Sequence, residues 1–267
     1  MRIVITGTSS GIGQHLAQHF AAQSHEVWGL ARSPQKATFT TSECDVSQWE
    51  QVERVTAAVA ERWPRIDALI CAAAIQGAIG PAMDADPRAW SQAVRTNLDG
   101  TFYTIRAFWP LLRAGGQRAK IVCFSGGGAT KARPNFSAYA ASKTGIVRLV
   151  ENLAVEWAGV PVDINAVAPG AINTAMTQEM VRLGPERAGR AEFEAAQRQI
   201  TEGGQSIEKA RSLVEFLLSE KSDGVTGRLL SAQWDDWADL PAHAAALAAG
   251  EIYQLRRILP EERGAKF

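Results

Sequence analysis

Short apolar runs rich in β-branched residues recur along the chain, separated by longer segments with a different periodicity. The short runs cover residues 3–6, 26–31, 68–71, 120–125, 163–168 and 228–232. In the longer segments, apolar residues recur at the three- and four-residue spacing of amphipathic helices, over residues 13–23, 48–63, 90–112, 138–157 and 206–219. This alternation predicts an α/β fold, a doubly wound parallel sheet with helices on both faces.

The length of 267 residues fits a single domain built on one such sheet. We expect the domain to span residues 1–232, with residues 233–267 forming a C-terminal extension that packs on it or on a neighbouring subunit. Residues 174–204 are polar and weakly periodic, and they follow a late strand, where open α/β sheets usually carry a substrate lid. We call this segment the lid and expect its order to depend on ligand.

The composition argues against several kinds of binding partner. The 28 lysines and arginines balance 28 aspartates and glutamates, so no excess charge attracts nucleic acid or an anionic membrane. No apolar run approaches a membrane span, and the start meets a glycine turn too early for a secretion signal, so we expect a cytoplasmic protein. Cys44, Cys71 and Cys123 lack C-x-x-C spacing, which favours reduced thiols over disulfides or a metal site.

A glycine-rich turn joins the first predicted strand to the first predicted helix. Glycines allow the backbone to approach a pyrophosphate closely, and the positive helix start favours its negative charge. Because the turn has this strand-turn-helix context, it predicts a Rossmann-like dinucleotide site. The residues expected to bind there are Gly7, Ser9, Ser10, Gly11, Ile12 and Gly13.

The end of the second predicted strand indicates which dinucleotide binds. An NAD-specific site normally carries a carboxylate there, which hydrogen-bonds the adenosine ribose. This chain has Ala31 instead, followed by Arg32 and Ser33, which offer a guanidinium and a hydroxyl to a 2′-phosphate. The sequence therefore favours NADP(H) over NAD(H).

Tyr139 and Lys143 lie four residues apart in a predicted amphipathic helix, which places the phenol and the ammonium on one face. A phenol with a pKa of about 10 is a poor acid-base catalyst at neutral pH. A nearby lysine cation stabilises the phenolate and moves its pKa toward the working pH. The pair is therefore a candidate proton-transfer site.

With the glycine turn, this pair makes the sequence resemble the short-chain dehydrogenase/reductase family, in its shorter subgroup with T-G-x-x-x-G-x-G and Y-x-x-x-K motifs. The resemblance covers about residues 1–232. Further matches follow in family order: Asp45-Val46, Asn97, Ser125 and Pro169-Gly170-Ala171-Ile172-Asn173-Thr174.

The resemblance implies further cofactor contacts. Asp45 and Val46 would contact the adenine, and Lys143 would hold the nicotinamide ribose as well as acting on Tyr139. After the fourth strand the chain reads Cys71-Ala72-Ala73-Ala74, where the family usually has Asn-Asn-Ala-Gly. The other implied contacts are Ala72, Ala73 and Ala74 on the cofactor floor, Pro169 and Gly170, and Ile172 with Thr174 at the carboxamide.

The resemblance also implies a catalytic set of Ser125, Tyr139, Lys143 and Asn97. Ser125 would hydrogen-bond the substrate oxygen while hydride moves between the nicotinamide and the carbonyl carbon. Tyr139 would deliver or take the proton. Asn97 would hold a water that relays protons to Lys143. The chain has Ser125-Gly126-Gly127-Gly128 where the family more often has a Ser-Ser pair.

The activity implied is NADP(H)-dependent interconversion of a ketone and a secondary alcohol, without a metal. Two alternatives are a non-catalytic NAD(P)-binding regulator or scaffold, and a sugar epimerase or dehydratase; the glycine spacing and modest tail argue against the second. The helices that carry Asn97 and Tyr139 form dimer and tetramer contacts in similar proteins, so we expect a homotetramer.

The tail offers one hint about substrate. Trp234-Asp235-Asp236-Trp237 and Arg256-Arg257 would together suit a stacking and anion-binding wall. Such a wall is typical of sites for carbohydrate derivatives, so a sugar or polysaccharide precursor is our hypothesis for the substrate.

Overall fold

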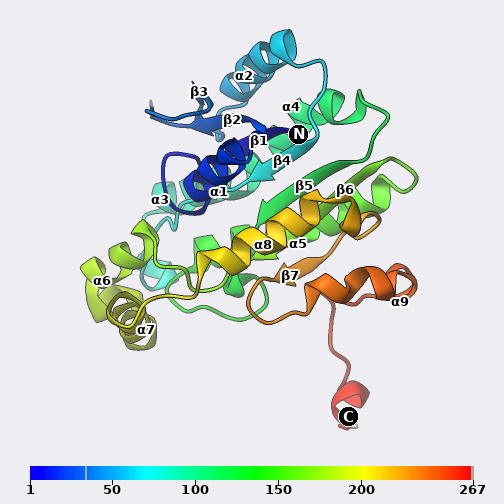
Figure 1. Ribbon diagram of the computed structural model, residues 1–267. Helices are drawn as coiled ribbons and strands as arrows, with labels where there is room; N and C mark the ends of the chain where they lie inside the picture. The colour runs from blue at the N-terminus through cyan, green and yellow to red at the C-terminus, as the bar shows by residue number, and fades with distance from the viewer. Residues whose placement is uncertain (34, 266–267) are drawn as a thin grey trace.

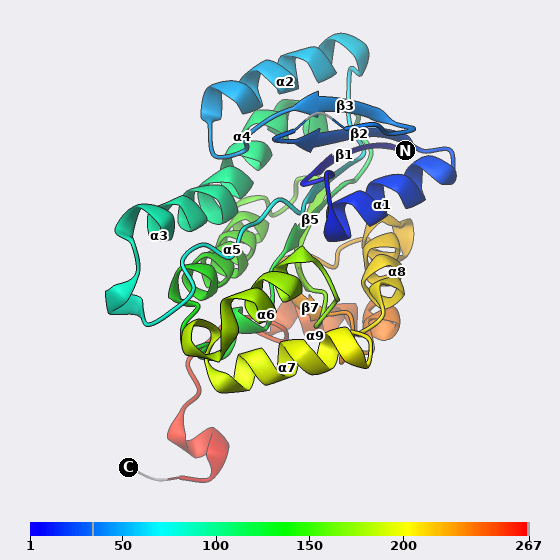
Figure 2. The ribbon, with the colours of Figure 1, turned by 90° about the vertical axis from the view of Figure 1, so that its left-hand side faces the viewer.

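The computed structural model describes residues 1–33 and 35–265, and within them the chain forms one seven-stranded parallel sheet. The strand order is β3-β2-β1-β4-β5-β6-β7, the doubly wound arrangement that the sequence predicts. Helices cover both faces of this sheet (Figures 1 and 2). The strands are β1 (Arg2–Thr6), β2 (Glu26–Ala31), β3 (Thr40–Glu43), β4 (Ala68–Cys71), β5 (Ala119–Phe124), β6 (Val162–Ala168) and β7 (Leu229–Ser231).

The apolar runs locate every strand except β3. That strand reads Thr-Thr-Ser-Glu and lies at the edge of the sheet, where it pairs with β2 alone. Its side chains are half-buried or exposed, so its sequence has none of the apolar residues that mark the central strands. Asp45 and Val46 follow it closely, as the resemblance implies.

Two helical layers enclose the sheet. α1 and α8 pack on one face, and α2, α4 and α5 pack on the other. The remaining helices lie outside these layers. The bounds are α1 (Gly11–Ala22), α2 (Trp49–Arg62), α3 (Pro87–Val94), α4 (Gly100–Arg113), α5 (Ser137–Glu156), α6 (Ala175–Ala188), α7 (Arg190–Thr201), α8 (Ile207–Leu218) and α9 (Ala244–Ala249).

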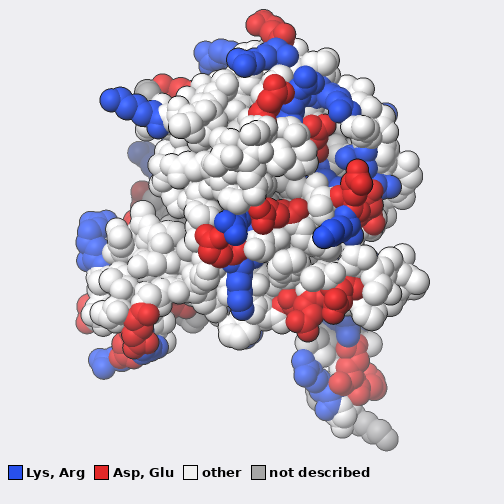
Figure 3. Space-filling view, viewed as in Figure 1, with Lys and Arg blue, Asp and Glu red and all other residues white. Residues whose placement is uncertain are grey.

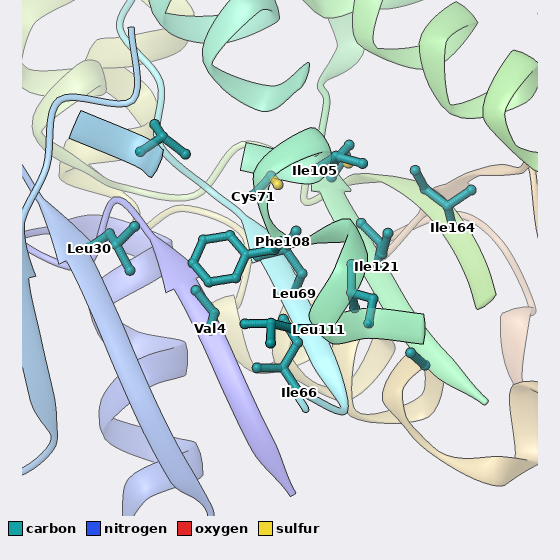
Figure 4. Packing of buried hydrophobic residues seen from close by; sticks show 14 of the residues in the cluster. Val4, Leu30, Ile66, Leu69, Cys71, Ile105, Phe108, Leu111, Ile121 and Ile164 are labelled. Carbon is teal, nitrogen blue, oxygen red and sulfur yellow. The ribbon is translucent and has the colours of Figure 1, made fainter. Parts of the chain in front are cut away.

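The core explains why the central strands read as continuous apolar runs. Alternate residues of a strand point to opposite faces, so Val4 packs toward α4 while Ile3 and Ile5 pack toward α1 and α8. Phe108 of α4 is fully buried and lies over Val4, Leu69 and their neighbours (Figure 4). Burial on both faces makes the sheet a rigid support for the loops at its carboxyl edge.

The helix predicted over residues 90–112 is interrupted by a π-helical turn at Arg95–Asp99, which separates α3 from α4. Asn97 lies in this turn and is fully buried. Gly100 follows the π turn directly, and a Cβ on it would lie 2.7 Å from a methyl carbon of Val46. The close approach of α4 to Val46 therefore requires glycine at this position.

The lid is helical. α6 is kinked at Gly184 (φ 74°), and Gly189 (φ 83°) separates it from α7; these backbone conformations favour glycine. Figures 1 and 2 both show α6 and α7 side by side beyond the end of the sheet. The weak apolar periodicity reflects the smaller core beneath these helices, which buries few residues of each.

The C-terminal tail packs against the rest of the same chain up to Leu255. Arg228, beside β7, donates hydrogen bonds to the carbonyls of Leu247, Gly250 and Ile252, and the backbone N–H of Leu255 donates to Glu151 of α5 at 2.6 Å. Beyond it, the segment to residue 265 extends away from the domain (Figure 1). Side chains of both signs are interspersed on the visible face, around a broad area without charged residues (Figure 3).

None of the helices in the described part of the chain has both the length and the apolar character needed to cross a membrane.

A buried hydroxyl ties the ends of β1 and β4 together. Thr6 is 2% exposed, and its Oγ1 accepts hydrogen bonds from the backbone N–H groups of Ala72 and Ala73 at 3.0 and 3.1 Å. Because these two donors lie in a loop with no side chains of its own to bond, the Thr6 hydroxyl fixes the position of that loop.

We predict that Thr6→Val, which keeps the side-chain shape, lowers the free energy of unfolding by about 1–3 kcal/mol because it leaves buried donors unpaired. The matched control is Thr104→Val: Thr104 is equally buried, but its hydroxyl only donates to the Gly100 carbonyl of its own helix. Urea unfolding compares the two. A loss for Thr6→Val no larger than for Thr104→Val would contradict the anchoring role.

Candidate active site

A cleft runs along the carboxyl edge of the sheet, across the point where the strand order reverses between β1 and β4. Open α/β sheets bind ligands at such a point. The lining residues come from the ends of β1 to β6 or the loops after them, the starts of α1 and α5, the π turn and the start of the lid. They are Gly7, Ser9–Gly13, Leu30–Arg32, Cys44–Val46, Ala72–Ile75, Thr96, Phe124, Ser125, Tyr139, Lys143, Pro169 and Thr174–Met176.

The glycine turn has the backbone that a pyrophosphate site needs. Gly7 and Gly11 have φ values of 77° and 58°, in the region that favours glycine. A Cβ on Gly13 would lie 2.4 Å from the Gly7 carbonyl oxygen, so only glycine allows the helix to start this close to the strand. The first turn of α1 has no acidic residue and no side-chain cap, which leaves its N–H groups available to an anion.

The end of β2 carries no carboxylate toward the cleft. Ala31 is buried and Arg32 is exposed at the cleft margin. Ser33 lies outside the cleft, in a neighbouring hollow that it shares with Ser9 and Lys36. This end of the cleft therefore presents cations and hydroxyls.

Asp45 and Val46, in the loop after β3, line the cleft as well. Oδ1 of Asp45 accepts hydrogen bonds from the backbone N–H and the hydroxyl of Ser47 at 3.0 and 2.7 Å. The carboxylate is thus held by its own loop, and its other oxygen is left for a ligand. Val46 is 5% exposed beneath Gly100.

The floor of the cleft is made of small residues held from behind. Ala72 and Ala73 are fixed by Thr6, and Asn97 holds the next part of the loop. Asn97 Oδ1 accepts from the N–H of Ile75, and Nδ2 donates to the Ile75 carbonyl and to Ser142 Oγ, all at 2.9 Å. The Asn97 side chain therefore supports the floor from outside the cleft; its predicted water relay stays a prediction.

The candidate catalytic side chains meet at the ends of β5 and α5. Ser125 Oγ donates to the Lys143 carbonyl at 3.1 Å, and Lys143 Nζ donates to the Phe124 carbonyl at 2.7 Å. Lys143 Nζ lies 5.6 Å from the centroid of the Tyr139 ring. The three groups that the sequence places 14 and 4 residues apart thus line one end of the same cleft.

Burial shifts the pKa values of this pair in opposite directions and separates them. Burial lowers the pKa of Lys143 to about 8, because the charged ammonium loses hydration. Burial raises the pKa of Tyr139, and the Arg133 cation works against that increase. The site can thus hold an ammonium beside a neutral phenol at neutral pH.

The loop after β6 joins the floor to the lid. Thr174 lines the cleft and forms a capping box with Thr177 at the start of α6. Ile172 is 7% exposed and packs into the core, and Gly170 (φ 93°) packs against Gln205 and Gln233. Neither Ile172 nor Gly170 lines the cleft; both support the loop that does.

Among the sequence-predicted site residues, those outside the cleft lining are Ser33, Asn97, Gly170 and Ile172. The lining also includes residues that the sequence analysis does not predict: Leu30, Cys44, Ile75, Thr96, Phe124, Ala175 and Met176. Leu30 and Phe124 lie at the ends of strands, so the strand pattern could have predicted their place at the carboxyl edge. The place of Thr96 could not be predicted, because the π turn that carries it leaves no signal in the apolar periodicity.

The tail residues do not form the predicted stacking wall. Trp237 packs on Phe216 of α8 with ring centroids 5.4 Å apart, whereas Trp234 is 80% exposed. Arg256 forms an ion pair with Glu262 within the tail. The two tryptophans therefore lie in different surroundings, and Trp237 is partly buried against the core.

Comparison with known proteins assigns the family. The family model described as enoyl-(acyl carrier protein) reductase matches residues 7–233. Levodione reductase of Leifsonia aquatica is 31% identical, over 85% of this chain and 91% of its own. Galactitol 2-dehydrogenase (L-tagatose-forming) of Cereibacter sphaeroides is 34% identical, over 66% of this chain and 73% of its own.

Solved structures support the same family assignment. A levodione reductase structure superposes with a TM-score of 0.77 and 29% identity, covering 90% of this chain and 97% of the other. An actinorhodin polyketide ketoreductase variant with NADPH gives a TM-score of 0.74 and 25% identity, covering 86% and 94%. The chain therefore belongs to the short-chain dehydrogenase/reductase family, as an NAD(P)-dependent oxidoreductase that interconverts ketones and alcohols.

Proposed function

We propose that this enzyme uses NADP(H), with Tyr139 as the acid-base residue, to interconvert a ketone and a secondary alcohol. The observation that carries the proposal is the shared cleft: the glycine turn and the Ser125, Tyr139 and Lys143 side chains line one continuous surface. A dinucleotide held at one end and a proton donor at the other is what hydride transfer to a carbonyl needs.

The residues of the cleft fit the cofactor. The N–H groups of Ser9 to Gly13 would hold the pyrophosphate, and Arg32 and Ser33 the 2′-phosphate. Asp45 and Val46 would contact the adenine, Lys143 the nicotinamide ribose, and Thr174 the carboxamide, with Ile172 and Pro169-Gly170 supporting that loop. When bound, the nicotinamide supplies or accepts the hydride.

The protein's own contribution is the proton. In the direction of reduction, the Tyr139 hydroxyl donates a proton to the alkoxide oxygen, and the Lys143 ammonium stabilises the phenolate left behind. In oxidation the same phenolate accepts the alcohol proton. Ser125 Oγ, which donates to the Lys143 carbonyl, would turn to the substrate oxygen and stabilise its developing charge. Asn97 keeps the floor beneath this site in place.

Preference for NADP(H) is supported by the lack of a carboxylate after β2. Ala31 removes the like-charge repulsion that an acidic residue would exert on a 2′-phosphate, and Arg32 stands exposed at the margin of the cleft. The actinorhodin polyketide ketoreductase, which is similar in fold, carries NADPH in its structure.

For the substrate we propose a polyol or sugar-like ketone, supported by the similarity to galactitol 2-dehydrogenase. The paired tryptophans, which suggested such a substrate from the sequence, do not support it, because Trp237 is packed on α8. A homotetramer stays a prediction.

Tyr139→Phe removes only the phenol oxygen, so we predict that kcat falls about 100- to 10,000-fold while NADPH affinity changes little. Steady-state kinetics and calorimetric titration measure the two effects. The control is Tyr103→Phe, which alters a tyrosine packed on Trp49 outside the cleft and should keep wild-type kcat. A Tyr139→Phe enzyme that retained most of its kcat would refute the assigned role.

Arg32→Ala removes the proposed 2′-phosphate contact. We predict that it weakens NADPH binding by about 1–3 kcal/mol, the range of a charge-assisted hydrogen bond, and leaves NADH binding nearly unchanged. Arg88→Ala, an exposed arginine on α3, serves as the control in the same titrations. Equal weakening of both dinucleotides by Arg32→Ala would remove the basis for NADP(H) preference.

A further inference from the structure

Arg133 connects the loop before α5 to both helices of the lid. Its Nε and Nη2 donate to Oε2 of Glu192 on α7 at 3.0 and 2.7 Å. Nη2 also lies 3.4 Å from the sulfur of Met180 on α6. Within residues 1–33 and 35–265, this is the one ion pair that joins the lid to the rest of the chain.

The same guanidinium lies over aromatic rings of α5 and its approach. Its Cζ is 4.0 Å from the Phe136 ring centroid and 5.6 Å from that of Tyr139. Cation-π contacts of this kind are stronger where water is excluded, and the Arg133 side chain is only 19% exposed. Arg133 thus holds its charge beside the Tyr139 ring while it binds the lid.

Beneath this contact lies a small apolar core of the lid. It is separate from the two large clusters on the faces of the sheet, and the Tyr139 ring and Phe193 pack against it. Its buried members are Ile79, Phe136, Met180, Ala188 and Ala196. The Arg133–Glu192 ion pair lies at the edge of this small core and adds a polar contact between the lid and the rest of the chain.

Arg133 contacts the lid between its two ends, each of which has an attachment of its own. One end is fixed by the capping box of Thr174, and the other by Gln205, whose side chain accepts from the N–H of Ala171 at 2.7 Å. Between the two ends, Gly184 and Gly189 adopt glycine-type conformations that interrupt the helices. Arg133 contacts the helices on both sides of Gly189, through Met180 of α6 and Glu192 of α7.

We propose that Arg133 is a positioning residue: its ion pair with Glu192 latches the lid onto the loop before α5, and its cation, held on Phe136, favours the charged form of the Tyr139 phenol. This proposal deepens the proposed function and rests on it for the role of Tyr139.

The charges near the phenol are few. Arg133 faces Tyr139 from the loop before α5, and Lys143 from α5 itself. Glu192 of α7 stands behind Arg133. Arg187 of α6 donates to the Ile79 carbonyl at 3.3 Å, at the edge of the same apolar core. Ser125 of β5 is polar and uncharged. Burial raises the pKa of Tyr139 and the Arg133 cation lowers it, which agrees in direction with the geometry.

The test compares Arg133→Met and Glu192→Gln with Lys131→Met, which removes an exposed cation from the same loop. The rate of tryptic cleavage within the lid, measured in the absence of substrate, shows how firmly the Arg133–Glu192 ion pair holds the lid. We expect Arg133→Met and Glu192→Gln each to accelerate it about two- to fivefold, the range for losing one partly exposed ion pair. Lys131→Met should leave it unchanged.

The pH profile of kcat for alcohol oxidation shows the effect of the Arg133 charge on the Tyr139 phenol. Oxidation needs the phenolate, so its rate rises with pH through the phenol pKa. Arg133→Met should move this rise to higher pH by about one unit, because a neighbouring cation is lost. Glu192→Gln should not move it upward, because the Phe136 contact keeps the guanidinium in place.

Wild-type lid cleavage in both variants, or an unshifted profile in Arg133→Met, would overturn the proposal. An upward shift in Glu192→Gln equal to that in Arg133→Met would also overturn it, since the profile would then follow lid position rather than the Arg133 charge. Failure of the proposed function is distinguishable: no carbonyl or alcohol would be turned over by the wild type, while the cleavage rates would still decide the latch.

Discussion

The whole site depends on the close approach of three backbone segments at the carboxyl edge of the sheet. A Cβ on Gly7 would lie 2.8 Å from the Cα of Ala73, and one on Gly13 would lie 2.4 Å from the Gly7 carbonyl oxygen. Only glycine allows strand β1, the start of α1 and the floor loop to meet at these distances. The N–H groups of α1 and the small floor residues take their positions from this contact.

Behind that contact, buried hydrogen bonds hold the loops that carry no suitable side chains of their own. Thr6 and Asn97 hold the floor loop, and Gln205 holds the loop that leads into the lid. At the catalytic end, burial depresses the pKa of Lys143 to about 8 and raises that of Tyr139. The same exclusion of water that makes the scaffold rigid therefore sets the electrostatics of the candidate proton donor.

Much of this arrangement could be predicted from the sequence because it depends on local patterns. Continuous apolar runs predict strands buried on both faces, and the glycine turn between a strand and a helix predicts the phosphate-binding end of the cleft. β3 escaped prediction because an edge strand needs no apolar residues. The Arg133–Glu192 contact escaped it because the two residues lie 59 positions apart, and only the folded lid brings them together.

Calorimetric titration of the unmodified protein with NADPH and, separately, with NADH tests directly whether this cleft is an NADP(H) site. We expect saturable binding of both, with NADPH the tighter ligand. Binding of neither dinucleotide would contradict it and would favour a non-catalytic scaffold whose altered floor, Cys71-Ala72-Ala73-Ala74, no longer accepts a cofactor.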